Sequence, residues 1–147
     1  MFAGEKRGKI MLFRIREFYL YDGDSADLTL DLGFDLVTYQ KCRIEGVDTP
    51  ELRGGTDEQK KAGYLARDRA REWCADRFAS PGIWFRSETY RGKFGRPLGD
   101  ICDAGIGSLR EYLINNNYGV PYHGEAKSKV AALHAKNLNI LKQRGEL

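Results

Sequence analysis

The stretch DLTLDLG, residues 27–33, alternates strictly between polar and apolar side chains. Successive side chains of a strand point to opposite faces, so this alternation predicts a half-buried β-strand. The inward set is Leu28, Leu30 and Leu32, and the outward set is Asp27, Thr29 and Asp31. Gly33 permits a tight hairpin, and we therefore expect another strand to follow over residues 34–47.

The segment before this hairpin predicts a further strand. Residues 9–21, KIMLFRIREFYLY, are rich in aromatic and β-branched side chains, which favour strands. Asp22, Gly23 and Asp24 come next, and these residue types favour a turn. The chain is therefore expected to begin with three strands, with a turn full of carboxylates between the first two.

The third strand is expected to end at Thr49-Pro50, because proline lacks a backbone donor and pushes its predecessor into an extended conformation. Thr56 and Gln59 then form a capping-box pattern, which predicts a long helix to about Ala79. Ser80-Pro81-Gly82 ends it. The predicted apolar face of the helix comprises Leu65, Ala66, Ala70, Trp73, Cys74 and Phe78.

The rest of the chain predicts two strands and two helices. We expect strands from Ile83 and over residues 98–102, and a short helix after a second capping-box pattern at Ser108. A turn over residues 120–122 then leads to an amphipathic helix over about residues 125–142, which is expected to pack onto the barrel or sheet. This order of elements predicts a mainly β or α+β fold, a five-stranded OB-fold barrel with three helices.

The composition fits one such domain. The chain has 147 residues, of which 41% are hydrophobic, so we expect a single domain over residues 1–147. The formal net charge of +3 allows a polyanionic partner without requiring one.

No stretch resembles a signal peptide or could span a bilayer, so we expect a cytoplasmic monomer without a membrane partner. Cys42, Cys74 and Cys102 are widely spaced and lie in apolar patterns, which indicates small buried side chains rather than a disulfide or zinc framework.

The stretch richest in reactive groups is RIEGVDTPE, residues 43–51, at the end of the third predicted strand. It places the guanidinium of Arg43 close in sequence to the carboxylates of Asp48 and Glu51. Carboxylate oxygens suit Ca²⁺ or Mg²⁺, and a guanidinium suits a phosphate. A helix cap or a surface ion pair is the alternative interpretation. A second candidate site is the loop over residues 89–96, which combines two glycines with basic and aromatic side chains.

Three motifs follow one another along the chain: DGDS at residues 22–25, RIEGVDTPE at residues 43–51 and KFGRPLG at residues 93–99. In their order and approximate spacing they resemble the motifs of the thermonuclease family, typified by staphylococcal nuclease. The resemblance covers about residues 21–122 and includes the five-strand layout. It implies a calcium-dependent endonuclease that hydrolyses single- or double-stranded DNA, and also RNA, by attack of water on phosphorus, and that leaves 3′-phosphate ends.

The resemblance also implies roles for the matching residues. Asp24 and Asp48 would give carboxylate oxygens to the calcium ion, and Thr49 would give its backbone carbonyl. Water and a substrate phosphate would complete the coordination.

Three further residues match the family's catalytic groups. Glu51 matches the residue that orients or deprotonates the attacking water. Arg43 and Arg96 match the two arginines that grip the scissile phosphate, where bidentate contacts stabilise the extra charge of five-coordinate phosphorus.

Substrate binding is implied for three more residues. Lys93 would meet a phosphate, and Tyr122 would stack on a base. Phe94 stands where the family has a tyrosine, which keeps the aromatic surface but loses a hydrogen-bond donor. Ser25 replaces the usual threonine and keeps the hydroxyl. An inhibitor or regulatory partner would be one way to restrain such a nuclease inside a cell.

Other interpretations remain for the same residues. A barrel of this type can be a non-catalytic module that binds nucleic acid or protein, and the charged cluster can be structural. Asp22 is interpreted as stabilising its own turn. The sequence further predicts surface roles for His123 and His134, core positions for Trp73 and Trp84, and a solvated helix face for Arg67, Arg69 and Arg71.

Overall fold

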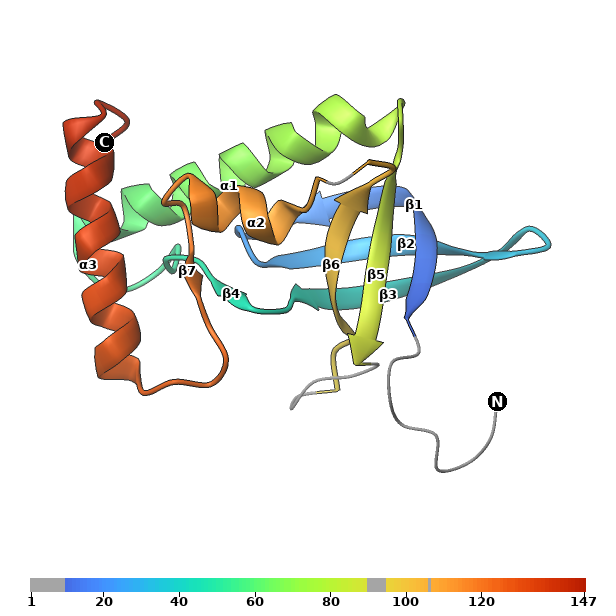
Figure 1. Ribbon diagram of the computed structural model, residues 1–147, viewed down its shortest axis with the longest axis horizontal. Coiled ribbons are helices and arrows are strands. Elements are labelled where there is room, and N and C mark those ends of the chain that lie inside the picture. Colours follow the sequence, from blue (N-terminus) through green and yellow to red (C-terminus); the bar gives the residue numbers. More distant parts are fainter. Residues whose placement is uncertain (1–9, 90–94, 106) are drawn as a thin grey trace.

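The computed structural model describes residues 10–89, 95–105 and 107–147. Its centre is a closed five-stranded barrel accompanied by three helices, so the predicted OB-fold-like α+β class is confirmed (Figure 1). The barrel order is β1-β2-β3-β6-β5, in which β3 and β6 are parallel and the other neighbours are antiparallel. The barrel strands are β1 (Met11–Leu20), β2 (Ser25–Gly33), β3 (Leu36–Ile44), β5 (Ile83–Thr89) and β6 (Leu98–Asp103).

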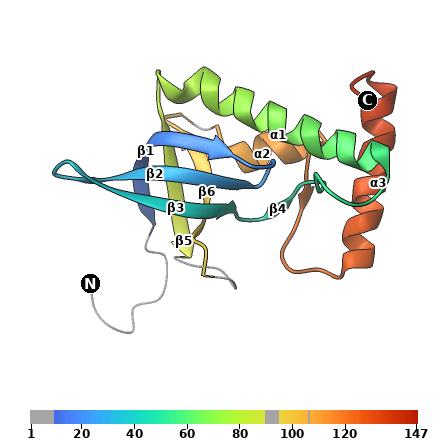
Figure 2. The same cartoon turned by 180° about the vertical axis from the view of Figure 1, so that it is seen from behind.

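The predicted hairpin forms between β2 and β3, whose register runs from Ser25 opposite Arg43 to Gly33 opposite Leu36. Its turn residues, Phe34 and Asp35, have φ angles of 54° and 64°, as required in a two-residue hairpin turn that matches the twist of the strands. The hairpin extends well past the other barrel strands, as Figures 1 and 2 show from opposite sides.

The alternation along β2 is only partly confirmed. Leu28 and Leu30 are buried, but Leu32 is 47% exposed, because at that point the hairpin has left the barrel and has no core beneath it. Thr29 is buried instead of exposed. It pairs with Glu17 on one side and Tyr39 on the other, so larger neighbours cover it.

The predicted long helix is α1 (Asp57–Phe78), and its capping box is complete. Thr56 accepts a hydrogen bond from the Gln59 amide at 3.1 Å, and the Gln59 side chain accepts one from the Thr56 amide at 2.8 Å. Such a cap is worth about 1 kcal/mol of helix stability. The helix thus starts where the sequence predicted, and it runs along one side of the barrel (Figure 2).

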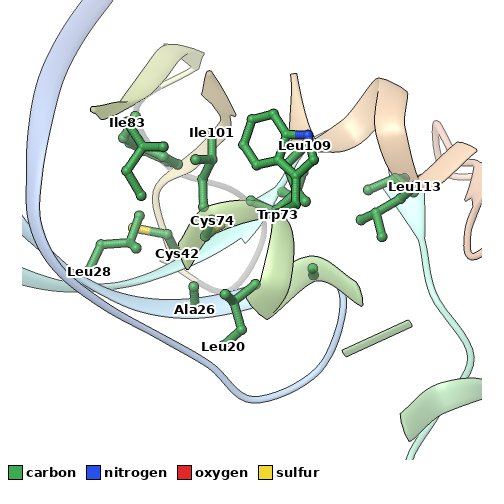
Figure 3. Close-up of a cluster of buried hydrophobic side chains, with 14 of the residues drawn as sticks. Leu20, Ala26, Leu28, Cys42, Trp73, Cys74, Ile83, Ile101, Leu109 and Leu113 are labelled. Carbon is green, nitrogen blue, oxygen red and sulfur yellow. The ribbon is translucent and has the colours of Figure 1, made fainter. Parts of the chain in front are cut away.

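The core lies between the barrel and the buried face of α1. Figure 3 shows Leu28, Ile83 and Ile101 of the barrel facing Trp73 and Cys74 of α1. Cys42 and Cys74 are buried as predicted, whereas Cys102 is half-buried. Trp73 is a core residue as predicted. Trp84 is only half-buried, with the Arg14 guanidinium 4.9 Å from its ring centroid.

Two of the three α1 arginines are not simply solvated. The Arg71 guanidinium donates to the Leu20 carbonyl at 3.0 and 2.7 Å, and Arg69 pairs with Glu146 at 3.5 Å. Arg67 does pair with its neighbour Asp68 on the helix surface. The predicted solvated face therefore partly serves to tie α1 to β1 and to the last residues of the chain.

The elements after the barrel differ from the sequence prediction at the segment before the last helix. The expected turn at residues 120–122 begins as strand β7 (Val120–Pro121), which pairs with β4 (Val47–Asp48) outside the barrel. Helix α2 (Leu109–Asn115) is capped by Ser108 as predicted. Helix α3 (Lys127–Gln143) contacts α1 and β7 and lies at the end of the molecule opposite the hairpin (Figures 1 and 2), so of the two expected packings, on the barrel or on a sheet, it adopts the one on the small β4-β7 sheet.

None of the helices in the described part of the chain combines the length and apolar character needed to cross a membrane.

Gly63 on α1 lets the chain after β4 approach the helix closely. A Cβ atom at this position would lie 2.6 Å from the Glu51 carbonyl oxygen and 2.8 Å from that of Pro50. Real Cβ contacts are longer, so any side chain here forces one backbone to move. Gly63 therefore helps to set the position of residues 50 and 51.

Gly63→Ala is expected to destabilise the fold by about 1–3 kcal/mol through overpacking, although glycine to alanine in an exposed helix stabilises by about 1 kcal/mol. Urea unfolding of both proteins measures the difference. Lys61→Ala, at an exposed position of the same helix, is the control and should change stability by less than about 0.5 kcal/mol. A Gly63→Ala protein that is more stable than the wild type would contradict the close approach.

Candidate functional site

The turn between β1 and β2 supplies the central group of the site, the carboxylate of Asp24, which is 4% exposed. Its Oδ1 lies 3.0 Å from Nη1 of Arg43 and accepts a hydrogen bond from the Ser25 hydroxyl at 3.2 Å. Its Oδ2 accepts a hydrogen bond from the Thr49 amide at 2.9 Å. Asp24 therefore joins this turn both to the end of β3 and to the segment after β4.

Gly23 makes this junction possible. A Cβ atom at Gly23 would lie 2.6 Å from Cγ2 of Thr49. The glycine thus allows Thr49 to pack directly on the turn and to donate its amide hydrogen to Asp24.

Arg43 stands between two carboxylates. Besides Asp24, its Nη2 contacts Oδ1 of Asp48 at 3.5 Å and the Val47 carbonyl at 3.3 Å. Burial alone would lower the pKa of Arg43, but the charges of Asp24 and Asp48 outweigh it and raise the pKa above its ordinary value. The guanidinium therefore stays charged and is shared by both acids.

Asp48 has a second partner, which the sequence analysis did not identify. Nε2 of His134, on α3, lies 2.8 Å from Oδ2 of Asp48. The prediction of a surface role for His134 is therefore wrong, since its ring is half-buried against the site. The two residues are 86 positions apart, and no sequence spacing signals such a pair. His123, by contrast, is exposed as predicted.

Two buried polar atoms next to these contacts have no hydrogen-bond partner within the described residues. They are the hydroxyl oxygen of Thr49 and Nδ1 of His134. Buried polar atoms are rarely left unpaired in folded proteins. The cluster is thus not fully satisfied by the groups that form it.

Asp22 lies in the same turn and behaves as the sequence predicted, since its Oδ1 accepts a hydrogen bond from the Asp24 amide at 3.1 Å. Burial, followed by the negative charge of Asp24, raises the pKa of Asp22 to about 7. Burial and the nearby charge of Asp24 therefore favour the protonated form of Asp22 more than in an exposed aspartate.

Glu51 is exposed at the edge of this cluster. It lines a cavity of about 230 Å³ together with His134, Arg53 and residues from the start of α1 and from α3. The predicted general base is therefore open to solvent and next to a space that can hold water or substrate.

For the remaining predicted site residues, the structure gives burial and backbone contacts or does not describe them. Arg96 is half-buried and precedes Pro97, whose carbonyl accepts a hydrogen bond from the Arg43 amide at 3.0 Å, so the two arginines lie on adjacent segments. Tyr122 is half-buried, and its amide donates to the Gly46 carbonyl at 3.0 Å. Lys93 and Phe94 lie outside the described residues.

Within residues 10–89, 95–105 and 107–147, no group of three or more His, Cys, Asp or Glu side chains is arranged to hold a metal ion. Comparison of the chain with protein-family models and with curated proteins gives no match.

Asp24→Ala is expected to lower the free energy of unfolding by about 3–5 kcal/mol, because it leaves a partly buried guanidinium without its closest partner. Urea unfolding in the presence of a chelator measures this loss without any contribution from bound metal. The exposed Glu51 provides the matched control, since Glu51→Ala should cost less than about 0.5 kcal/mol. Equal stability of the two variants would show that Asp24 does not hold the segments together.

Proposed function

We propose that this protein is a calcium-dependent nuclease that hydrolyses phosphodiester bonds in DNA and RNA by attack of water on phosphorus, leaving 3′-phosphate ends. The observation that supports the proposal best is the convergence of Asp24, Arg43, Asp48 and Thr49. They come from three segments, and His134, which contacts Asp48, shares a cavity with the exposed carboxylate of Glu51. Such a set offers oxygen donors, a phosphate-binding guanidinium and a base within one small region.

In this proposal separate residues activate the water, bind the scissile phosphate and bind the rest of the substrate. Glu51, exposed beside the cavity, accepts the proton of the attacking water or orients it. Arg43 and Arg96 bind the non-bridging oxygens of the phosphate and stabilise their charge in the transition state. Lys93, Phe94 and Tyr122 would bind the flanking phosphate and base, in line with the resemblance of the motifs.

The oxygen donors of a cation would be carboxylates. Asp24 and Asp48 lie on either side of Arg43, and the described residues hold no group of three or more His, Cys, Asp or Glu side chains arranged for a metal ion. We propose that their carboxylates and the Thr49 carbonyl hold Ca²⁺, whose preferred ligands are oxygens. Bound there, the ion would add positive charge next to the phosphate.

A non-catalytic module that binds nucleic acid or protein is the second candidate. It is favoured by the contacts of Asp24, whose two oxygens already bond Arg43, Ser25 and the Thr49 amide. These contacts alone are enough for the cluster to stabilise the fold without any catalytic role.

The first test is release of acid-soluble nucleotides from single- and double-stranded DNA and from RNA, with calcium, with magnesium and with a chelator. We expect calcium-dependent cleavage, and a fall by a factor on the order of 10² to 10⁴ in Glu51→Gln, which keeps the shape but loses the base. Because Glu51 is exposed, the variant should unfold at the same urea concentration as the wild type. Nucleic-acid binding without cleavage would favour the binding module instead.

The arginines are tested separately with Arg96→Lys. Lysine keeps the charge but loses the planar fork of donors, so we expect the cleavage rate to fall by a factor on the order of 10² or more. Arg16→Lys, which alters an exposed arginine paired with Asp31 away from the site, should leave the rate unchanged. A loss of less than tenfold in Arg96→Lys would remove Arg96 from the phosphate-binding role.

A further inference from the structure

The outer edge of β3 is open along most of its length. β3 pairs with β6 only at Arg43 opposite Leu98 and at Ile44 opposite Gly99. Among the described residues, no strand pairs with this edge over residues 36–41, where the hairpin projects past the barrel (Figures 1 and 2). Such an edge presents free backbone donors and acceptors to another strand.

The hydrogen-bond phase of β3 identifies which residues face the open edge. The Arg43 amide donates to the Pro97 carbonyl, away from β2. Residues of an antiparallel strand direct their backbone groups alternately to its two sides. Val37, Tyr39 and Lys41 therefore direct their N–H and C=O groups outward, in the same sense as Arg43.

The side chains of this hairpin are unusually apolar for an exposed position. Phe34 is 99% exposed and adopts a left-handed φ of 54°, a conformation that costs energy for a bulky residue. Tyr39 is 73% exposed. The other exposed apolar side chains of the hairpin are Leu32, Leu36 and Val37. Nothing in the described part of the chain covers them, so a partner is the natural source of burial.

The sequence of the open edge is complementary to itself. When two copies of β3 run antiparallel about a two-fold axis at Thr38, Val37 lies opposite Tyr39 of the second copy, and Asp35 lies opposite its Lys41. Val37 and Tyr39 are both outward-facing positions, as a hydrogen-bonded antiparallel pair requires, whereas Asp35 belongs to the turn before β3 and meets Lys41 through its side chain alone. Each dimer would then gain two Asp35–Lys41 pairs and two Val37–Tyr39 pairs, which are favourable cross-strand combinations.

We propose that the protein forms a two-fold symmetric dimer through antiparallel pairing of the β3 edges, centred on Thr38. The charges select this register. Moving the axis to Tyr39 places Lys41 opposite Val37 and leaves Asp35 to face Arg43, which Asp24 and Asp48 already hold. The Lys41 side chain is 71% exposed and contacts Tyr21 and Asp27 on the same sheet surface, so it is accessible to a second copy.

A dimer of this kind differs from the monomer expected from the sequence, and sedimentation distinguishes the two. It is independent of the proposed nuclease activity, because it uses none of the candidate site residues. Association and cleavage can thus be measured separately on the full chain.

Sedimentation equilibrium over a range of protein concentrations tests the pairing through charge reversal. Asp35→Lys and Lys41→Asp each create two like-charge pairs per dimer, and each is expected to weaken association about tenfold. The double variant Asp35→Lys/Lys41→Asp restores opposite charges and should return to the wild-type dissociation constant. Urea unfolding of each variant confirms that the barrel itself is intact.

Cysteine cross-linking tests the register, in a Cys102→Ser background that removes the half-buried thiol. Thr38→Cys places two thiols at a non-hydrogen-bonded pair with Cα atoms about 4.5 Å apart, which suits a disulfide. Gln40→Cys, two residues along the same strand, separates them by about 14 Å and is the matched control. We expect a covalent dimer from Thr38→Cys alone under mild oxidation.

Three results would overturn the proposal. They are a wild-type protein that stays monomeric at all concentrations, single charge reversals that leave the dissociation constant unchanged, and cross-linking of Gln40→Cys as fast as of Thr38→Cys.

Discussion

The geometry of the candidate site depends on one buried carboxylate, that of Asp24. Its two oxygens bind groups from separate segments, the Arg43 guanidinium at the end of β3 and the Thr49 amide after β4. A buried carboxylate needs such partners, because the cost of removing it from water is otherwise not offset. The contacts of Asp24 therefore hold the β1–β2 turn, Arg43 and Thr49 in one place. Stability and site geometry cannot be separated at this residue.

Local signals made most of the fold predictable from the sequence. The alternation of residues 27–33 and the capping box at Thr56 each depend on neighbours within a few positions, and both elements formed where expected. Leu32 and the start of β7 were predicted wrongly for a common reason. Whether a strand residue is buried, and whether a short extended segment finds a partner, depends on distant parts of the chain.

In the candidate site, too, contacts between sequence neighbours were predictable, whereas contacts between distant parts of the chain were not. Arg43 and Asp48 are near each other in sequence, and their contact was foreseeable from the strand end that joins them. Asp24 was placed beside them only through the resemblance of motifs, and His134 was missed. Its bond to Asp48 arises because α3 lies against α1 and β7 rather than on the barrel. Helix packing of this kind leaves no spacing pattern in the sequence.

The charged cluster and the projecting tip of the hairpin lie at opposite ends of β2 and β3. Ser25 and Arg43 pair at the end that carries the charged cluster, whereas Gly33 and Leu36 pair at the projecting tip. In the proposed dimer the antiparallel register places Asp35 of one copy opposite Lys41 of the other, two residues from Arg43. Each projecting tip would therefore lie close to the other copy's charged cluster, although the pairing itself uses none of its residues.

The contacts of Arg43 also bear on how this residue would bind a phosphate in the proposed function. Its Nη1 lies 3.0 Å from Oδ1 of Asp24, whereas its Nη2 lies 3.3 Å from the Val47 carbonyl and 3.5 Å from Asp48. Asp48 is meanwhile bound more closely by His134, at 2.8 Å. One end of the guanidinium is therefore fixed and the other is weakly held. In the proposed function an incoming phosphate oxygen would take the place of Asp48 at Nη2 while the Asp24 pair stays in place, so the same arginine would stabilise the fold and bind the substrate.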